Sequence, residues 1–539
     1  MILLKNKIAA SAVCWLLIIG LLSARLYYLA RPGSEYADVQ VSARAVEIAS
    51  SRGFIYDRNL MPLTYTKKVY KTCIRPSPAA LIKIRNIITD GNVLNTLKKG
   101  NLAVYSSDSQ LNLKNDDDIL NLSLFERYSG ESLCHLTGFV SGSGKGIGGI
   151  EEAFDKYLKS ADGKIEAIYH TDALGRLLLN EPIEIRDTNF FSKKGVVITV
   201  DGKIQTITEN ALKDSDIDMG AAVVLSAENA EIIACVSVPA FNRKDIRENI
   251  TDKNSPFINR AFTAFSVGSV FKAVTAAAAL ENGIKINEFS CGGKITESGT
   301  VFNCSKRDGH GNLNLTGALA LSCNPYFIEL AVKTGAENII KTAKKLGFGR
   351  KTVLYGSLVS DTGNLPSKSS VDSAAALGNL GFGQGELLAT PLQIAACYAA
   401  IANGGIYNEP SLIKGFIDKD GRFSEYNQTA ENGQRVLSAE TCTELEQGLY
   451  ECVKNGTGKN AYSPFFEACG KTATAQTGRY NEDNSEVLIS WFCGYFPKDN
   501  PKYVICIMKE NGASGSSDDA PVFKEIAQNI WFEENFNCN

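Results

Sequence analysis

A chain of 539 residues is longer than one ordinary hydrophobic core can organise, so we expect two or more domains. Hydrophobic residues make up 44% of the chain and charged residues 21%, which is typical of a folded protein and excludes a polyelectrolyte. The formal net charge of −3 provides no basic face for nucleic acid, so we expect no nucleic-acid partner.

The N-terminus carries an apolar run without a charged residue, from Ile8 to Ala24, at the short end of what spans a bilayer as a helix. A cleaved signal peptide is the alternative, but no clean A-x-A-like cleavage site is present. We therefore predict a short cytoplasmic tail and a transmembrane anchor within residues 1–33. Positive charges on the two sides of the run nearly balance, so charge alone does not orient it. Because only four residues precede Lys5, the bulk of the chain is expected on the far side, outside the cell membrane.

The region after the anchor, residues 34–185, is polar and irregular, with short strand-like pieces. Its glycine-rich stretch "SGSGKGIGGIEE" lacks the G-x-x-x-x-G-K-[ST] frame of a phosphate-binding loop. A turn that enters a helix, "IEEAFDKYLKS", is the better interpretation.

From about residue 190 the pattern changes to clear strands and helices. "GVVITVD" predicts a strand, "GKIQTITENALK" an amphipathic helix, and "GAAVVLSAENAEIIACVSV" a β-hairpin. Further helices are expected over 269–281, closed by Asn282-Gly283, and at about 314–333 and 391–402. "EVLISWFCGYF" and "KYVICIMKE" predict two strands before a last helix, "APVFKEIAQNIWFEE". Strands at both ends with helices between them predict an α/β (α+β) domain over 186–539, with an antiparallel sheet closed by its two termini.

Fourteen cysteines are unusual for an exported protein, in which an oxidising compartment would pair them. The chain has no C-x-x-C and only three histidines, and the spacing shows no Cys/His cluster of the zinc type. Several cysteines, such as Cys235, Cys397 and Cys506, lie inside apolar runs and are interpreted as small buried hydrophobes. We expect an exported protein from an environment that keeps thiols reduced.

The segment "FSVGSVFKAV" places a serine and a lysine three positions apart at the start of a helix. A Ser-His-Asp triad has few candidates, and His310 in "DGHGN" has no adjacent nucleophile signature. A lysine with a lowered pKa can replace histidine as the base, and Ser269 and Lys272 would share one helix face. The alternative is a solvated Lys272 and a turn-forming Ser269, because S-x-x-K alone recurs by chance.

Two further motifs follow in order, Ser322-Cys323-Asn324 in "ALSCNPYF" and Lys471-Thr472-Ala473 in "ACGKTATAQTG". S-x-x-K, a Ser-x-Asn element and K-T-G together are the signature of penicillin-binding proteins and class A β-lactamases. Taken singly, Ser322 and Asn324 are also suited to cap a helix, and Lys471 to protect a strand edge. The three motifs in this order favour the catalytic interpretation.

At this point the sequence resembles the class B penicillin-binding proteins, membrane-anchored peptidoglycan D,D-transpeptidases, over almost the whole chain. "RGFIYDRNLMPL" looks like the start of that family's non-catalytic pedestal, which would occupy 34–185, and "GHGNLNL" and "WFCGYFP" match stretches of its catalytic region. We expect Arg52, Asp57 and Arg58 of the first stretch to form ion pairs that fix the pedestal against the catalytic domain. The implied fold is the serine β-lactamase-like penicillin-binding transpeptidase fold over 186–539.

The resemblance implies an acyl-transfer mechanism without a metal or cofactor. Ser269 would attack the carbonyl of the penultimate D-alanine of a stem pentapeptide, and Lys272 would take its proton. Ser322 would relay the proton to the leaving D-alanine, and Asn324 would hold both the lysine and the substrate amide. An amine from a neighbouring stem peptide would then open the acyl-enzyme.

The resemblance also implies the substrate-binding residues. Lys471 and Thr472 would bind the terminal carboxylate, and the backbone N–H groups of Ser269 and Thr474 would form the oxyanion hole. Ala473 departs from the family's glycine, and its methyl points either to the back of the sheet or toward the substrate. If it faces the substrate, we expect reduced acylation by bulky β-lactams. Val267 is a second departure, where the family usually has proline.

Three alternatives remain at this stage. A β-lactamase or a β-lactam sensor shares the fold, although no convincing E-x-x-L-N element holds a deacylating water here. A non-catalytic scaffold is the third, if Ala473 has spoiled the site. No room for a glycosyltransferase domain is expected between the anchor and the pedestal. The resemblance therefore implies a SEDS-type glycosyltransferase and other cell-wall proteins as partners, beside the membrane, stem peptides and β-lactams.

Overall fold

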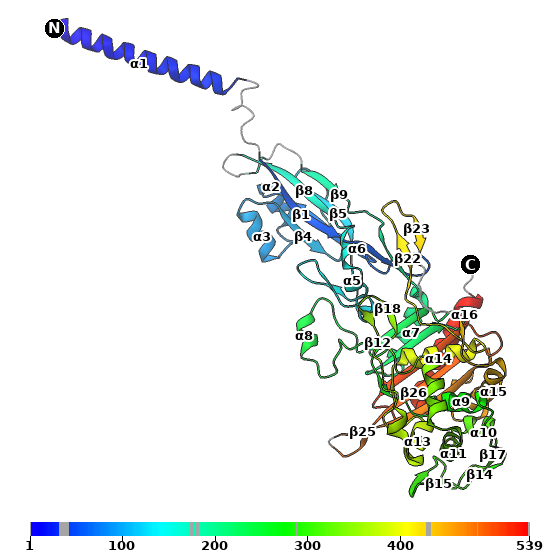
Figure 1. The fold of residues 1–539 in the computed structure, drawn as a ribbon. Helices are drawn as coiled ribbons and strands as arrows, with labels where there is room; N and C mark the ends of the chain where they lie inside the picture. Colours follow the sequence, from blue (N-terminus) through cyan, green and yellow to red (C-terminus); the bar gives the residue numbers. More distant parts are fainter. Residues whose placement is uncertain are drawn as a thin grey trace. The chain divides into compact units, whose positions relative to one another are not determined.

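The computed structural model describes residues 2–31, 42–128, 130–172, 177–178, 183–286, 288–426, 433–481 and 483–536 (Figure 1). The chain divides into two compact units that are interleaved in sequence. Unit 1 comprises Met1–Arg52, Lys67–Arg127 and Asp162–Ser192, and unit 2 comprises Gly53–Thr66, Tyr128–Ala161 and Lys193–Asn539. Unit 2 is therefore built from three separate segments.

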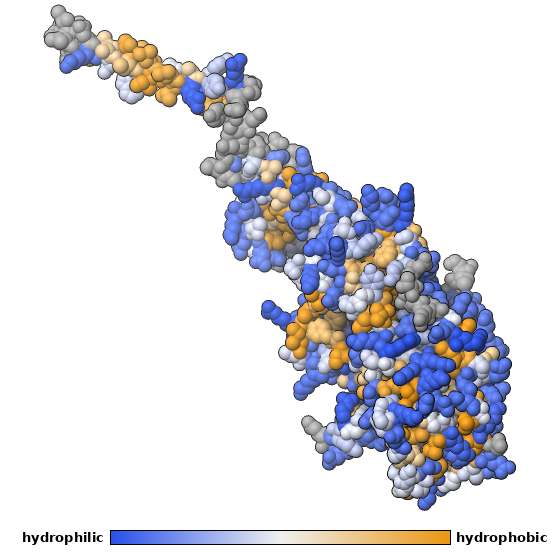
Figure 2. All heavy atoms as spheres, viewed as in Figure 1, coloured by the Kyte–Doolittle hydropathy of each residue, from blue (hydrophilic) through white to orange (hydrophobic). Residues whose placement is uncertain are grey.

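The N-terminal segment forms a single helix, α1 (Ile2–Leu29). Its stretch Lys7–Leu29 has a mean hydropathy of 2.0, and its apolar window contains no buried residue, so by length and composition it is a candidate membrane span. Figure 2 shows the exposed apolar side chains along this helix. The predicted apolar anchor segment is thus a helix long enough to cross a bilayer.

Unit 1 contains two three-stranded antiparallel sheets, ordered β1-β8-β9 and β4-β3-β5. Ile48, Cys73, Leu124 and Ile165 form part of a common core between them. A second cluster buries one face of each of the two short helices α2 and α3. The elements after α1 are β1 (Ser42–Ser51), β3 (Lys67–Ile74), α2 (Pro78–Ile84), α3 (Gly91–Lys98), β4 (Ala103–Ser107), β5 (Ile119–Glu126), β8 (Gly163–Thr171) and β9 (Glu184–Thr188).

Unit 2 is a mixed α/β body with one five-stranded sheet and several small ones. Its strands are β2 (Phe54–Tyr56), β6 (Phe139–Val140), β7 (Gly146–Ile147), β10 (Gly195–Ile198), β11 (Gly220–Ser226), β12 (Ile232–Val238), β13 (Phe265–Ser266), β14 (Phe289–Cys291), β15 (Lys294–Glu297), β16 (Thr300–Asn303), β17 (Gly311–Leu313), β18 (Val353–Tyr355), β19 (Leu358–Val359), β20 (Leu388–Ala389), β21 (Ile406–Tyr407), β22 (Ile413–Ile417), β23 (Phe423–Glu425), β24 (Gln434–Arg435), β25 (Cys469–Tyr480), β26 (Glu486–Phe496) and β27 (Tyr503–Glu510).

Unit 2 also contains the helices that cover its five-stranded sheet and those that carry residues of the site described below. They are α4 (Cys134–Thr137), α5 (Gly149–Ala153), α6 (Asp155–Lys159), α7 (Gly202–Asp214), α8 (Ile246–Ile250), η1 (Gly268–Phe271), α9 (Lys272–Glu281), α10 (Leu315–Ala320), α11 (Asn324–Thr334), α12 (Ala336–Lys345), η2 (Lys368–Val371), α13 (Ala374–Gly381), α14 (Pro391–Ala402), α15 (Ala439–Asn455), η3 (Lys459–Ala461), η4 (Gly515–Asp519) and α16 (Ala520–Phe536).

The five-stranded sheet has the order β12-β11-β27-β26-β25 and is antiparallel throughout. The predicted hairpin β11–β12 is confirmed, and β11 pairs with β27, so the sheet does close from the two ends of the region. Alternate residues face opposite sides: Val223 packs in the cluster with α9 and α14, and Val224 in the cluster with α7 and α16. Because strand side chains alternate, the result is a three-layer body (Figure 1).

The helix predicted at about 314–333 is interrupted, which corrects that expectation. α10 ends at Ala320, and α11 begins at Asn324. Between them Ser322 adopts a left-handed backbone with φ of +56°, a conformation that costs a non-glycine residue roughly 1–2 kcal/mol. Pro325 lies in the first turn of α11, where proline is favoured. The break presents Ser322 and Asn324 at the start of a new helix.

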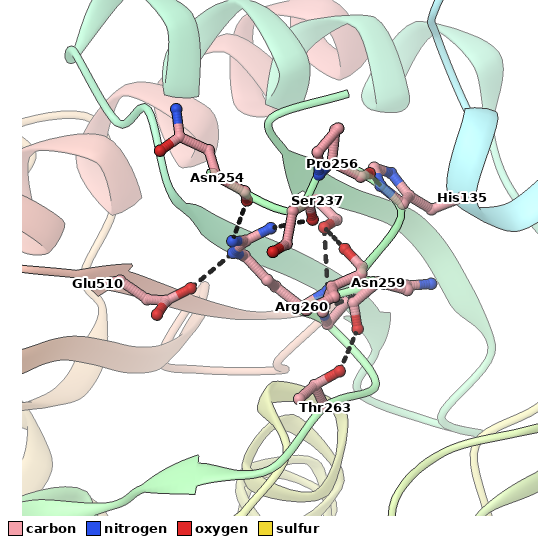
Figure 3. Close-up of polar contacts among 11 residues, drawn as sticks. His135, Ser237, Asn254, Pro256, Asn259, Arg260, Thr263 and Glu510 are labelled. Carbon is pink, nitrogen blue, oxygen red and sulfur yellow. Dashed lines mark hydrogen bonds and ion pairs between the residues drawn. The ribbon is translucent and has the colours of Figure 1, made fainter. Parts of the chain in front are cut away.

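A buried arginine anchors the segment that leads into the nucleophile turn (Figure 3). Arg260 is 2% exposed, and its Nε lies 2.6 Å from Glu510 Oε1. Its other two guanidinium nitrogens donate to the carbonyl oxygens of Ser255 at 3.3 Å and Asn254 at 2.7 Å. Its backbone N–H donates to Ser237 Oγ at 2.9 Å. These contacts hold one loop against the C-terminal ends of β12 and β27.

The loop after β2 is fixed within unit 2. Arg58 pairs with Glu231 at 3.1 Å, as expected for a residue that forms ion pairs. The ion pair expected for Asp57 is wrong, because its carboxylate holds backbone groups instead. Asp57 Oδ1 accepts the N–H groups of Asn59 and Met61 at 2.8 Å, and Oδ2 accepts that of Gly202 at 3.3 Å. Asp57 is 4% exposed, so no water replaces these bonds freely.

Asp57→Ala is therefore expected to lower the free energy of unfolding by about 1–3 kcal/mol, because buried N–H donors lose their acceptor. Thermal unfolding of the full-length chain measures this. Asp57→Asn keeps one acceptor oxygen and serves as the milder matched variant. The rate of covalent labelling by penicillin, which the resemblance implies, should stay unchanged. A slower labelling rate at unchanged melting temperature would contradict this structural role.

The cysteines agree with the interpretation as small buried hydrophobes. Every cysteine in the described part of the chain is free, and all of them except Cys14 are buried. Cys397 of α14 and Cys506 of β27, for example, have no exposed surface and lie within the main core cluster. Burial of this kind explains a high cysteine content without disulfides.

Candidate active site

Ser269 lies in the first turn of the central helix of unit 2. The helix begins as the 3₁₀ turn η1, Gly268–Phe271, and continues as α9 from Lys272, whose N–H donates to the Ser269 carbonyl. Gly268 has φ of +68°, and its N–H donates to the Gly383 carbonyl at 2.8 Å. The Ser269 side chain is partly exposed, and its hydroxyl has no hydrogen-bond partner among the described residues. The hydroxyl is thus available to a ligand.

Lys272 is fully buried and binds the second motif. Its Nζ donates to Asn324 Oδ1 at 2.7 Å, to the Ser322 carbonyl at 2.8 Å and to Ser322 Oγ at 3.1 Å. The Phe327 ring lies 5.5 Å from the same nitrogen. The structure therefore brings Lys272, Ser322 and Asn324 together, one helical turn from Ser269.

The electrostatics of the site suit a lysine that accepts protons. Burial, and then the positive charge of Lys471, holds the pKa of Lys272 well below its ordinary value. Burial also lowers the pKa of Lys471. Because a lysine is a base only when uncharged, a lowered pKa makes Lys272 competent to take a proton from a neighbouring hydroxyl.

The third motif lies on β25, an edge strand of the five-stranded sheet. Lys471 is fully buried, and its Nζ donates to the Thr472 carbonyl at 3.0 Å. Thr472 Oγ1 lies 2.7 Å from Thr457 Oγ1. The half-buried Thr474 accepts a hydrogen bond from Gln384 Nε2 through its carbonyl at 3.5 Å. The free side of β25 thus carries the predicted binding residues next to η1.

Ala473 faces the nucleophile turn and not open solvent. It is 3% exposed, and a Cβ placed on Gly268 would lie 3.2 Å from the Ala473 methyl and from that of Ala475. The methyl therefore fills the space left by a glycine before Ser269. The expectation that it crowds bulky β-lactams loses its premise, because the methyl is packed against Gly268 of the nucleophile turn.

Ala473→Gly is expected to leave the acylation rates of a small and a bulky β-lactam equally unchanged. It should lower the free energy of unfolding by about 1–2 kcal/mol, from the lost buried methyl and the added backbone freedom. Second-order acylation rates and melting temperatures measure the two effects. Ala475→Gly, on the same face of β25, is the matched control. A selective gain in acylation by the bulky drug would show that the methyl does reach the ligand.

Some residues of the site were missed from the sequence. Phe327 lies three positions after Asn324, so helical spacing alone would have placed both on one face. Thr457 is far from any motif and had no local signal.

A group of three cysteines and one histidine was not predicted, because the sequence shows no Cys/His cluster of zinc spacing. Cys291, Cys304, His310 and Cys323 lie together, with their ligand atoms within 4.8 Å of one another. The signal in the sequence was a cysteine or histidine flanked by glycine, in "CGG" and "GHG".

Comparisons with known proteins agree with this geometry. Residues 220–528, which contain all three motifs, match the family model for the penicillin binding protein transpeptidase domain. Stage V sporulation protein D of Bacillus subtilis (strain 168) is 32% identical over 399 residues, which cover 71% of this chain and 59% of that protein. Peptidoglycan D,D-transpeptidase FtsI of Buchnera aphidicola subsp. Schizaphis graminum is 27% identical over 554 residues, which cover 95% of this chain and 92% of that protein.

A solved structure has the same fold. Penicillin binding protein 3 from Mycobacterium tuberculosis, crystallised with ampicillin, superposes with a TM-score of 0.66 at 25% identity. The match covers 92% of this chain and 97% of that chain. Among the curated relatives, the alignments span 59%, 65% and 62% of the first three, so the chain matches about three fifths of their length.

Proposed function

Because the chain belongs to the penicillin-binding protein transpeptidase family, we propose that it is a membrane-anchored, serine-type peptidoglycan D,D-transpeptidase, inhibited covalently by β-lactams. The observation that carries the proposal is the set of contacts from Lys272 Nζ to Ser322 and Asn324, one turn from the Ser269 hydroxyl, for which the described part of the chain offers no hydrogen-bond partner. These contacts support the assignment of Lys272 as a buried base, Ser322 as a hydroxyl relay and Asn324 as a positioning amide for a nucleophile at a helix start.

In the first half-reaction, Ser269 Oγ bonds to the carbonyl carbon of the penultimate D-alanine. Its proton passes to uncharged Lys272, and the N–H groups of Ser269 and Thr474 stabilise the oxyanion. The carbon–nitrogen bond to the terminal D-alanine then breaks, and the proton reaches the leaving amine through Lys272 and Ser322. In the second half-reaction, an amine of a neighbouring stem peptide attacks the ester carbonyl carbon and loses a proton to the same lysine. The new amide carbon–nitrogen bond forms, the bond from that carbon to Ser269 Oγ breaks, and the lysine returns the proton to Oγ.

Substrate binding uses the edge of the sheet. An edge strand leaves alternate backbone groups unpaired, so β25 is suited to pair with an extended stem peptide. Lys471 and Thr472 provide an ammonium and a hydroxyl for the terminal carboxylate, which is a charge-assisted contact. Ala473 lies between Thr472 and Thr474 in the strand, opposite Trp491 of β26.

The proposed placement follows from the N-terminal helix. With α1 in the membrane and a short cytoplasmic tail, within residues 1–33, the rest of the chain lies outside the cytoplasm. We assign a non-catalytic pedestal role to residues 34–185 and the transpeptidase role to 186–539. Glycan polymerisation then comes from a partner, a SEDS-type glycosyltransferase that meets the anchor and the pedestal.

Labelling with a fluorescent penicillin tests the proposal against its alternatives. A transpeptidase forms a long-lived adduct on Ser269, which peptide mapping locates. Rapid turnover of the adduct would indicate a β-lactamase, and the absence of any adduct a non-catalytic scaffold. Release of D-alanine from a D-Ala-D-Ala stem peptide by the full-length protein, together with a cross-linked product, separates a transpeptidase from a β-lactam sensor.

The pH dependence of the acylation rate is expected to change when the charge of Lys471 is removed, because that charge affects the pKa of Lys272. Positive Lys471 lowers the pKa of Lys272, so Lys471→Met should raise that pKa and shift the acidic limb of the pH–rate profile to higher pH. Labelling rates from about pH 5 to about pH 9 measure the limb. Lys459→Met, in η3, is the control and should leave the limb in place. A lower labelling rate with an unshifted acidic limb would show that Lys471 binds the carboxylate without tuning the pKa of Lys272.

A further inference from the structure

A groove of about 490 Å³ lies between the β25–β26 hairpin and the segment that leads to Ser269. Its lining includes Ser266, three residues before the nucleophile, and Thr477, three residues after Thr474. We propose that this groove binds the donor stem peptide upstream of D-Ala-D-Ala and selects a free carboxylate there over a carboxamide. The proposal rests on the proposed function, because it names the kind of stem peptide that acylates the same site.

The groove begins where β25 leaves the nucleophile turn. A Cβ on Gly268 would lie 3.2 Å from the methyl of Ala475, so the strand and the turn are in contact there. Two residues farther along β25, Thr477 lines the groove. The loop after α13 follows the same path, since Gln384 donates to the backbone of β25 at 3.5 Å and Leu388 lines the groove. The groove therefore adjoins the catalytic cleft at the C-terminal end of β25.

The direction of the bound peptide brings its upstream residues to this groove. In the proposed mechanism the terminal carboxylate binds at Lys471 and Thr472, and the scissile carbonyl binds at the N–H of Thr474. The donor peptide thus runs antiparallel to β25, with its earlier residues toward Thr477. An extended chain rises about 3.3 Å per residue, so Thr477 is about 10 Å from Thr474 along the strand. A long side chain just before D-Ala-D-Ala spans that distance.

The charges of the groove favour an anion. Lys253 and Arg479 are exposed lining residues, and neither side chain has an ion-pair partner among the residues that the structure describes. The third lining cation, Arg260, pairs at 2.6 Å with Glu510, the only carboxylate among the described lining residues (Figure 3). Glu486 of the same hairpin lies outside the lining, and its carboxylate accepts two hydrogen bonds from β25. Three cations against one carboxylate leave an excess of two positive charges.

The walls of the groove suit a peptide side chain that ends in a carboxylate. Ile489 is fully buried, Phe265 is half-buried and Leu388 is 37% exposed, so apolar surface is available to methylene groups. Its volume lies within the range of ligand sites, about 300–1,000 Å³. The guanidinium of Arg479 offers paired N–H donors that match the two oxygens of a carboxylate. A carboxamide has one acceptor oxygen and presents N–H groups of its own, so it fits two cations less well.

Two synthetic donor peptides test the selectivity. Both carry 2-aminopimelic acid immediately before D-Ala-D-Ala, with its side chain ending either in a free carboxylate or in a carboxamide. Glycine is the acceptor, so only the donor differs, and release of D-alanine by the full-length protein in detergent is measured. The carboxylate donor should have a kcat/KM about tenfold higher, mainly through a lower KM. The preference should shrink as salt is added, because the two cations are exposed.

The variants locate the selectivity in the groove. In the double variant Lys253→Gln, Arg479→Gln, the ratio of kcat/KM between the two donors should fall close to one. Arg247→Gln, which removes an exposed cation of α8 outside the groove lining, is the matched control and should keep the native ratio. The melting temperature of the double variant reports whether it is folded, and both substituted side chains are exposed.

A ratio near one in the native protein, or a native ratio that survives in the folded double variant, would overturn the proposal. A preference seen only when the carboxylate is placed on the acceptor amine would also overturn it, since the groove would then hold the acceptor. Failure of the proposed function looks different, because the native protein would release D-alanine from neither donor and form no penicillin adduct. Calorimetric binding of the two donors to Ser269→Ala measures the preference even then, with an expected difference of about tenfold in Kd.

Discussion

Ser269→Ala is expected to abolish covalent labelling by penicillin, with the rate reduced by about a thousandfold or more. The reason is that the ester bond to the drug forms through Ser269 Oγ, and no other group can replace that atom. The hydroxyl is partly exposed and has no partner in the described structure, so its loss should leave the melting temperature nearly unchanged. Gel fluorescence of a labelled penicillin and thermal unfolding of the same preparation measure the two quantities.

The controls separate the nucleophile from the base. Ser424→Ala changes an exposed serine of β23 and should label at the native rate. Lys272→Ala should lose labelling as well, through loss of the proton acceptor. Its buried site would also open a cavity, so it should unfold at a lower temperature than Ser269→Ala. Persistent labelling of Ser269→Ala would show that the nucleophile has been misassigned.

The largest expected effect on stability comes from Arg260. Arg260→Met removes one partner of a buried ion pair and leaves Glu510 with an uncompensated charge, which typically costs about 3–5 kcal/mol. Two backbone carbonyl acceptors lose their donor at the same time (Figure 3). Chemical and thermal unfolding of the full-length protein measure the loss. Because the loop leads to β13 and then to Ser269, a slower acylation rate is expected as well.

An exposed ion pair provides the control for the stability effect expected of Arg260→Met. Lys368 pairs with Glu337 on the surface, so Lys368→Met should change the free energy of unfolding by less than about 1 kcal/mol. The double variant Arg260→Met, Glu510→Gln should recover part of the stability, since it removes the isolated charge. A loss for Arg260→Met no greater than that for Lys368→Met would show that the buried network contributes little.

The sequence predicted most of the central sheet because its signals are local. The β11–β12 hairpin is two apolar strands around a polar turn, and β26 and β27 are similarly apolar. The break between α10 and α11 was not predicted, because the apolar pattern runs on without interruption. The left-handed turn at Ser322 coincides with its contacts to Lys272, which lies far away in the chain, so no local pattern encodes it.

The candidate site was predicted to a similar extent. Three short motifs identified Ser269, Lys272, Ser322, Asn324 and Lys471 through residue types and order alone. The burial of Ala473 against Gly268 depends on how closely β25 approaches η1, which is a matter of tertiary packing. The Cys/His cluster was missed because its members come from a hairpin, a turn and a helix start, and not from one short ligand motif.

The discontinuous make-up of unit 2 bears on how the protein is made. β2 can form its parallel pair only after β10 has been synthesised. The apolar hairpin β11–β12 can pair with β27 only when synthesis is close to the end of the chain. Pairings over such sequence distances are slow and leave hydrophobic strand edges open during synthesis, which favours aggregation. A chain that stops before Tyr503 lacks β27, so β11 and β26 each lose one of their two neighbouring strands. Premature termination near the C-terminus should therefore yield an aggregating product that chaperones or proteases remove, and not a partly active one.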